Sequence, residues 1–131
     1  MLKVKTYVGM SPGRGLGLFA AQQIAPGTKT WEYNSEFDES FSQEQVDLLP
    51  DFAKASFIKY AYFDSEINRF IMPVDDLRFI NHSEADFNIK SSPRADIAMR
   101  LIAEYEELFC NYLNYEENYF ERRNLDRSVW K

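Results

Sequence analysis

The chain has 131 residues, and its 45% apolar and 16% aromatic content excludes a disordered chain and favours one domain, residues 1–131, with a sizeable core. Its single cysteine excludes an internal disulfide and a zinc site built from several cysteines. The net charge of −6 disfavours direct binding to nucleic acid and favours basic partners such as lysine-rich peptides.

No apolar run approaches the roughly 18 residues that a membrane-spanning helix requires. The first five residues also lack the apolar core of a signal peptide. We therefore expect no membrane partner and a cytoplasmic location, or another intracellular one such as the nucleus if the source is eukaryotic.

The first third of the chain is typical of short strands separated by turns. Residues 3–8 alternate with a period of two, which predicts a strand. A glycine-rich loop is predicted over residues 13–20, with a second short strand at 18–21 and a turn at 25–27. β-Branched and aromatic residues at 28–33 predict a third strand.

Two short helices are predicted next. Ser42 and Gln45 have the spacing of a capping box, which predicts a helix that ends at Pro50. A second helix is predicted over residues 51–60. A further helical turn is predicted after Asp75, because aspartate caps helix N-termini well.

The remaining strands are predicted, in chain order, at residues 60–63, 69–72, 97–99 and 108–109. Many short strands with only short helices between them argue against a parallel sheet with crossover helices. The predicted fold class is mainly β with short helices, arranged as small sheets. The charged tail over residues 116–131 is predicted to be helical, and its aromatic residues Tyr119, Phe120 and Trp130 are expected to pack back.

The glycine segment has more than one interpretation. Gly15-x-Gly17-x-x-Ala20 formally matches the dinucleotide-binding fingerprint. That fingerprint requires a helix after the loop, and Pro26 interrupts the chain too soon for a crossover helix. A P-loop is excluded because no Gly-Lys-Ser/Thr sequence follows. A close approach of the backbone to a ligand and a plain tight turn between strands both remain open.

The only histidine, His82, lies between Asn81 and Ser83, and no second histidine or Cys-x-x-Cys pair is present to bind a metal with it. By itself His82 is typical of a structural hydrogen-bonding residue. A nucleophilic pair with Cys110 is disfavoured, because Cys110 stands in an apolar, strand-like run. Tyr112, one of eight tyrosines, is by itself typical of a core residue.

Taken together, three segments resemble the SET-domain protein-lysine methyltransferases. The segments that match the family's GxG, RFxNHS and GEELxxDY motifs are Gly15–Gly17, Arg78–Ser83 and Glu106–Tyr112. Residues 31–33 and 97–102 are also similar to strands of the family. The likeness covers a core of about residues 3–115, and the short segment between residues 36 and 72 resembles the minimal, stand-alone members of bacteria and viruses.

The resemblance implies the family's β-clip fold of small sheets, in which the C-terminal segment threads under a loop as a pseudoknot beside the Asn-His-Ser motif. It implies S-adenosyl-L-methionine as the cofactor, with no metal. It also implies that a lysine of a protein or peptide substrate enters from the opposite face through a narrow aromatic channel.

The resemblance also implies roles for individual residues. The implied cofactor-binding residues are Arg14, Gly15, Leu16, Gly17, Asn81 and His82. Tyr112 is the implied catalytic residue, and Tyr33, Cys110 and Tyr115 are the implied residues of the substrate channel. Because methyl transfer to an amine is an in-line displacement, the protein has to supply alignment and a dry channel that favours the neutral amine.

Several positions depart from the family. Its Asp before the last Tyr is Asn111, and its Gly before Glu-Glu-Leu is Tyr105. The segment after the Asn-His-Ser motif is one residue longer and lacks a proline, so the role of Asn88 stays open. Cys110 stands where the family has Phe or Tyr, which suggests a roomier pocket and higher methylation states. Without a zinc module after Tyr112, the tail or a partner subunit in a homodimer has to close the site.

Two rival interpretations remain. One is a catalytically inactive SET module that binds a protein or peptide, and the other is a methyltransferase for a non-histone or non-protein amine. Acidic residues near the predicted site suggest a preference for cationic substrates, namely Asp75, Asp76, Glu84 and Asp86.

Overall fold

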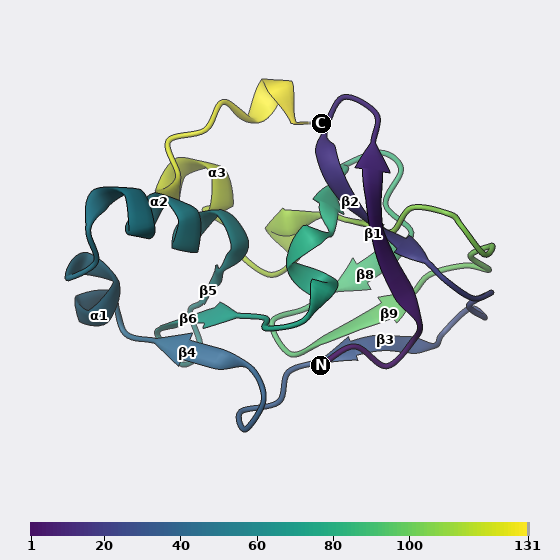
Figure 1. Ribbon diagram of the computed structural model, residues 1–131, viewed down its shortest axis with the longest axis horizontal. Coiled ribbons are helices and arrows are strands. Elements are labelled where there is room, and N and C mark those ends of the chain that lie inside the picture. Colours follow the sequence, from purple (N-terminus) through teal and green to yellow (C-terminus); the bar gives the residue numbers. More distant parts are fainter. Residues whose placement is uncertain (131) are drawn as a thin grey trace.

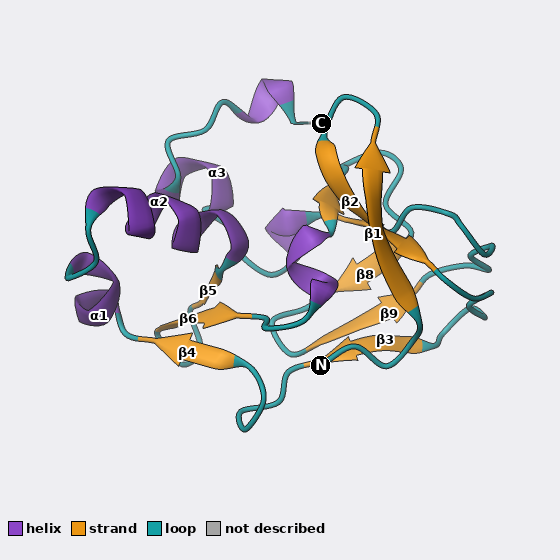
Figure 2. Ribbon diagram, viewed as in Figure 1, coloured by secondary structure: helices purple, strands orange, loops and turns teal. Residues whose placement is uncertain are grey.

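The computed structural model describes residues 1–130 as three small sheets with short helices between them (Figure 1). The strands are β1 Thr6–Ser11, β2 Gly15–Ala20, β3 Lys29–Glu32, β4 Glu39–Phe41, β5 Tyr62–Asp64, β6 Arg69–Met72, β7 Asn81–His82, β8 Ile89–Ser91, β9 Ala95–Ala98 and β10 Phe109–Cys110. The helices are α1 Gln43–Asp47, α2 Asp51–Tyr60 and α3 Tyr119–Arg122, and the 3₁₀ turns are η1 Asp76–Phe79, η2 Tyr112–Asn114 and η3 Arg127–Val129. Helices α1–α3 lie at one end of the molecule, above the β4–β6–β5 sheet, and the remaining strands form the other end (Figure 2). None of the helices in residues 1–130 is long and apolar enough to cross a membrane.

The glycine segment is mainly a strand and not a loop. Strands β1 and β2 form an antiparallel hairpin in which Gly9 pairs with Gly17. Only the turn between the strands is irregular, where Gly13 and Gly15 have φ angles of 73° and 82° that favour glycine. The predicted loop was therefore wrong at residues 15–17, where backbone pairing with β1 extends the strand to the turn, and the strand predicted at residues 18–21 is confirmed through Ala20.

The five-stranded sheet has the order β3–β9–β8–β10–β7 and contains the pseudoknot. Strand β10 lies parallel to both β7 and β8, which precede it by some 20 to 30 positions in the sequence. The connection between β7 and β8 also bonds to β10, since the Ser83 N–H donates to the Cys110 carbonyl at 3.0 Å. This arrangement confirms the predicted fold of small sheets with a threaded C-terminal segment.

The short helices form where the sequence predicts them. Ser42 and Gln45 make both hydrogen bonds of the capping box at the start of α1, and α2 covers the predicted residues 51–60. The Asp75 side chain accepts a hydrogen bond from the Leu77 N–H at the start of η1. The hydrophobic core is split, with the larger cluster under the five-stranded sheet and a smaller one beneath α2.

The tail is helical only in the short segments α3 and η3, so the prediction of a helical tail holds in part. It is fixed by Glu116, whose exposed fraction is 4% and which pairs with Arg122 and Arg123 at 2.9 and 3.0 Å. The Arg123 guanidinium also donates to the Ala61 carbonyl at 2.7 Å, and Glu116 accepts from the Phe63 N–H at 3.0 Å. We call this arrangement the tail clamp, because it binds the tail to α2 and β5.

Candidate active site

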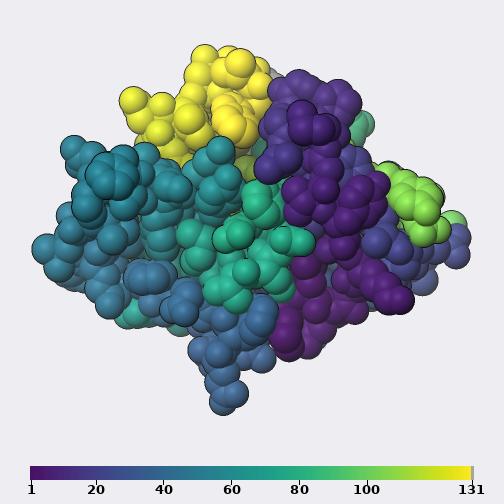
Figure 3. All heavy atoms as spheres, in the orientation of Figure 1, coloured from purple at the N-terminus to yellow at the C-terminus, as the bar shows by residue number. Residues whose placement is uncertain are grey.

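A wide groove of about 800 Å³ lies where four remote segments meet. They are the turn of the β1–β2 hairpin, helix α2, the η1–β7 segment and the tail. Figure 3 shows the C-terminal residues in yellow between the teal residues of α2 and the purple hairpin. The tail therefore forms a wall of the groove within a single chain.

Four of the six residues predicted to bind a cofactor line this groove: Arg14, Gly15, Leu16 and Asn81. They are held together by hydrogen bonds across the chain. The Arg14 guanidinium donates to the His82 carbonyl at 2.5 Å, and the Asn81 Nδ2 donates to the Leu16 carbonyl at 2.9 Å. The hairpin turn is thus tied to the Asn-His segment, although some 65 residues separate them in the sequence.

Gly17 does not line the groove, contrary to the sequence prediction. It is buried, and a Cβ atom at this position would lie 2.3 Å from the Glu107 Oε1. The Glu107 carboxylate accepts hydrogen bonds from the Ser11 hydroxyl at 2.9 Å and from Asn81 at 3.0 Å. Gly17 is therefore needed for packing beneath the site, because a side chain would displace this carboxylate.

The His82 side chain also lies away from the groove, beneath Tyr112. Its Nδ1 accepts a hydrogen bond from the Tyr112 N–H at 3.1 Å, and its Nε2 has no hydrogen-bond partner in residues 1–130. Burial lowers the pKa of His82, which keeps the ring neutral and able to accept at Nδ1. The structure assigns this histidine to the support of Tyr112, with only its carbonyl bonded to the groove residue Arg14.

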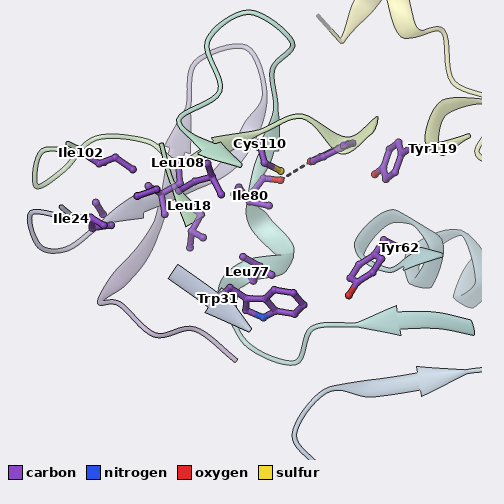
Figure 4. Packing of buried hydrophobic residues seen from close by; sticks show 14 of the residues in the cluster. Leu18, Ile24, Trp31, Tyr62, Leu77, Ile80, Ile102, Leu108, Cys110 and Tyr119 are labelled. Carbon is purple, nitrogen blue, oxygen red and sulfur yellow. Dashed lines mark hydrogen bonds between the residues drawn. The ribbon is translucent and has the colours of Figure 1, made fainter. Parts of the chain in front are cut away.

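Tyr112 stands at the junction of the groove and a second cavity. Its hydroxyl donates to the Ile80 carbonyl at 2.6 Å, the bond drawn as a dashed line in Figure 4. Burial raises the pKa of Tyr112 well above its usual value, so the hydroxyl keeps its proton and remains a donor. A polar pair of hydroxyl and carbonyl oxygen is thus fixed where the two cavities meet.

The second cavity is a narrow pocket of about 40 Å³ whose lining includes six aromatic residues, namely Trp31, Tyr60, Tyr62, Tyr112, Tyr115 and Tyr119. Trp31, Tyr62 and Tyr119 come from β3, β5 and α3 and surround it with Cys110 (Figure 4). Tyr115 also lines it, as predicted from the sequence, and its ring lies 5.2 Å from that of Tyr62. The pocket joins the groove at the six residues that line both cavities, namely Lys59, Tyr60, Arg78, Ile80, Tyr112 and Tyr119.

Tyr33 lies outside the lining of this pocket, contrary to its predicted place in the channel. Strand β3 ends at Glu32, the Tyr33 N–H bonds to the Arg94 carbonyl, and the Arg94 guanidinium lies 5.6 Å from the Tyr33 ring centre. Trp31, two residues earlier, takes the inward position. Sequence reasoning offered no ground for choosing Trp31 over Tyr33, because both aromatic residues belong to the same predicted strand.

Cys110 lines the pocket as predicted and is fully buried. Burial raises the pKa of its thiol well above the usual value, so the thiol keeps its proton. This agrees with the interpretation that Cys110 is an inert pocket residue and not a nucleophile.

The four acidic residues that suggested a cationic substrate do not line the pocket, so the choice of these residues was wrong: Asp75, Asp76, Glu84 and Asp86. Glu84 pairs with Arg127 at 2.7 Å, and Asp75 accepts from the Leu2 N–H at 2.7 Å. The one carboxylate in the lining is Asp96, which the sequence analysis missed. A signal was present in the alternation of β9, where Asp96 and Ala98 face inward and Ile97 is exposed.

The departures from the family motifs have local explanations. Tyr105 has a φ angle of 71°, so it occupies the left-handed conformation that favours the family's glycine. Asn111 caps η2 by accepting from the Leu113 N–H at 3.1 Å. Asn88 is buried and bonds to the Glu107 carbonyl and the Phe109 N–H at 2.8 and 2.9 Å, which fixes the approach to β10.

A comparison with protein families finds that the SET domain matches residues 15–113, which is most of the chain. The chain belongs to the SET-domain family. No curated protein matched it. The match covers the hairpin turn, the Asn-His segment and the segment that ends in Tyr112.

Solved structures of SET proteins resemble the chain in fold. A proposed histone methyltransferase from Plasmodium falciparum shares 21% identity at a TM-score of 0.60, over 85% of this chain and 95% of that one. A humanised Chaetomium thermophilum Polycomb Repressive Complex 2 bound to an inhibitor shares 25% identity at a TM-score of 0.63, over 90% of this chain. A structure of this type of complex with trimethylated histone H3 shares 26% identity at a TM-score of 0.62, over 83% of this chain. This SET chain spans only 16% and 14% of the two Polycomb chains.

Proposed function

We propose that this SET protein is an S-adenosylmethionine-dependent protein-lysine N-methyltransferase. The observation that carries the proposal is the junction at Tyr112, where a hydroxyl and the Ile80 carbonyl lie between a wide groove and a narrow aromatic pocket. A group-transfer enzyme needs two ligand sites that meet at one point, because the reacting atoms have to be brought into line. The family match and the histone methyltransferases among the similar structures support the same reaction.

The residues of the groove fit S-adenosylmethionine. The volume of about 800 Å³ is within the usual range for small-molecule sites. The exposed backbone of Gly15 and Leu16 offers polar groups, while Phe79 and Trp130 offer aromatic surfaces that suit a nucleobase. The cation Arg14 in the same lining suits a carboxylate. We propose these residues and Asn81 as the cofactor site.

The bound cofactor would supply an electrophilic methyl group on a sulfonium. The protein supplies alignment and a pocket from which water is largely excluded. Tyr112 and the Ile80 carbonyl orient the amine, since a hydroxyl held by a carbonyl leaves its lone pairs directed into the junction. The aromatic walls disfavour a charged amine, which promotes the neutral form that attacks the methyl group.

The partner that we propose is a protein or peptide that presents a lysine. One similar structure holds trimethylated histone H3, which shows that a methylated lysine ligand is found with that relative. The tail lines the groove and the pocket within one chain, so a homodimer is not needed to complete the walls. Dimerisation and a cytoplasmic location stay predictions.

Calorimetric titration of the purified chain with S-adenosylmethionine and S-adenosylhomocysteine tests the proposal. We expect saturable one-to-one binding that is weakened at least tenfold in Asn81→Ala, because Asn81 lines the groove and holds the hairpin turn. Gln23→Ala, an exposed residue that follows β2 and does not line the groove, is the control and is expected to bind normally. Mass spectrometry of lysine-containing peptides incubated with the protein then detects products 14 Da heavier per methyl group. Absence of binding at millimolar cofactor would contradict the proposal and favour an inactive binding module.

A further inference from the structure

Asp96 lines the pocket, and the proposed function assigns it no role. It lies in β9 directly opposite Trp31 on one side and Ser91 on the other, so these three side chains share one face of the sheet. All three line the pocket, and only 4% of Asp96 is exposed. A carboxylate is thus built into the wall of a narrow aromatic pocket.

Asp96 forms no ion pair within residues 1–130, although other acids in the same residues pair with lysine, arginine or the N-terminal amine. The neighbouring Ser91 hydroxyl lowers the pKa of Asp96 somewhat. The same hydroxyl has no partner at full hydrogen-bond geometry within residues 1–130. Burial prevails and raises the pKa of Asp96 to about 7. A buried carboxylate without a cation destabilises a fold, so its presence here calls for a ligand that compensates it.

The other titratable groups around the pocket do not supply that cation. Burial raises the pKa of both Tyr62 and Cys110, the Asp96 charge adds to the rise, and both groups stay protonated at neutral pH. Burial likewise keeps the phenols of three further tyrosines protonated, namely Tyr112, Tyr115 and Tyr119.

Two cations line the same pocket, and both have other partners. The Arg78 guanidinium lies over the rings of Tyr60 and Phe79, and the Lys59 ammonium lies over Tyr60. Behind Tyr62, Asp64 pairs with Arg94, and Asp38 pairs with the N-terminal amine. Of all these cations, only the N-terminal amine contributes to lowering the pKa of Asp96.

We propose that Asp96 binds the ammonium group of the substrate lysine and accepts one of its protons before methyl transfer. The catalytic part of this inference rests on the proposed function. In the step, one N–H bond of the ammonium breaks and one O–H bond forms on the carboxylate, so a charged pair becomes a neutral amine and a neutral acid. The released lone pair of the amine is then the nucleophile.

The pocket supports this role because Asp96 and Tyr112 line it together. The Tyr62 hydroxyl already donates to the Pro93 carbonyl at 2.6 Å, so it does not compete for the carboxylate. A carboxylate accepts N–H donors, and a trimethylated ammonium has none. Asp96 therefore also favours lysine and its lower methylated forms over the trimethylated form.

The test uses n-butylammonium as a mimic of the lysine side chain and needs neither cofactor nor turnover. The Asp96 carboxyl resonance is followed by ¹³C NMR over a pH titration, and Asp96→Asn assigns it by loss of the signal. We expect saturating n-butylammonium to lower the pKa of Asp96 by at least one unit, because a bound cation stabilises the carboxylate. We also expect at least tenfold weaker binding of this amine to Asp96→Asn.

Neutral n-butanol and N,N,N-trimethylbutylammonium are the control ligands, and the exposed acid variant Asp86→Asn is the control protein. The butanol affinity is expected to be equal in all proteins, and Asp86→Asn is expected to bind the amine normally. An unchanged pKa of Asp96 in the presence of the amine, or equal amine affinity in Asp96→Asn, would overturn the inference. A failure of the cofactor titration would instead contradict the methyltransferase proposal and leave the amine result standing.

In the active enzyme, a second readout separates a proton acceptor from a structural residue. The kcat/KM of Asp96→Asn is expected to fall at least 100-fold at pH 7 and to recover as pH rises toward the pKa of lysine, where the amine is already neutral. A uniform loss at every pH would assign Asp96 to structure alone.

Discussion

The groove and the pocket differ in width and in lining, although they share six residues, namely Lys59, Tyr60, Arg78, Ile80, Tyr112 and Tyr119. The groove measures about 800 Å³ and collects cations from α2, η1 and the tail. The pocket measures about 40 Å³ and is aromatic, with one buried carboxylate. Both linings include the cations Lys59 and Arg78, but Asp96 lines only the pocket, while Arg14, Arg122 and Arg123 line only the groove. The buried acid thus lies where we place an ammonium, and the additional cations lie where we place an anionic cofactor group.

The difference also reflects how each cavity is built. One wall of the pocket is the row of Trp31, Asp96 and Ser91 across the five-stranded sheet, so the shape of that wall follows from strand register. The groove is enclosed by a turn, a helix and a tail that only tertiary contacts hold together. The groove should therefore be the easier of the two to open by mutation.

The largest effect is expected from the tail clamp. Glu116→Ala leaves the buried Arg123 guanidinium without its carboxylate, and we expect the free energy of unfolding to fall by about 3–5 kcal/mol. Chemical denaturation measures this loss, with the exposed neighbour Glu117→Ala as the control. A loss below about 1 kcal/mol would show that the clamp does not hold the tail.

Because Asp96 is buried, we expect the free energy of unfolding to depend on pH. Because the pKa of Asp96 is raised to about 7 in the fold, its contribution is greatest when it is protonated and is lost as pH rises from about 4 through 7. The protein should lose as much as roughly 4 kcal/mol over this range relative to Asp96→Asn. Thermal or urea unfolding of both proteins at several pH values measures the difference. Parallel stability curves would contradict the burial of an uncompensated acid.

Cys110→Tyr affects the pocket alone, because Cys110 lines the pocket and not the groove. A phenol in a cavity of about 40 Å³ is expected to cost about 1–3 kcal/mol of stability and to shift the products toward fewer methyl groups. Mass spectrometry of mono-, di- and trimethylated products measures the shift, with Cys110→Ser as the control of similar size. An unchanged product distribution would show that Cys110 does not determine how many methyl groups are added.

The smallest effect is expected outside both cavities, at Tyr105. This exposed residue has a φ angle of 71°, which is costly for any residue with a Cβ atom. Tyr105→Gly should raise stability by about 1 kcal/mol, offset in part by the loss of its edge contact with Tyr7. Cofactor binding should not change. A clear loss of stability would mean that the ring contact outweighs the backbone strain.

The sequence predicted the parts of the fold that local chemistry determines. The capping box at Ser42 and the ten residues of α2 depend on neighbours in the chain, and both were found as predicted. The motifs brought together Asn81, Tyr112 and the hairpin turn, which do line the groove. These residues are recognisable because the family keeps their spacing.

The rest depends on register and on contacts between remote segments. Whether Trp31 or Tyr33 enters the pocket is decided by where β3 ends, which alternation alone does not fix. Gly17 and His82 belong to the motifs, yet they support the site from beneath because Glu107 and Tyr112 pack on them. Asp96 was missed because the predicted strand began one residue after it.

Tyr112→Phe, measured for cofactor binding and for methyl transfer on the same preparation, tests directly whether the reaction takes place at the junction. We expect cofactor affinity within about threefold of the parent protein, because the groove keeps its other walls. We expect methyl transfer to fall at least 100-fold, because the hydroxyl that orders the junction is gone. Methyl transfer that persists within a few fold in Tyr112→Phe, with the cofactor bound as before, would contradict the assignment of this junction as the site of the reaction.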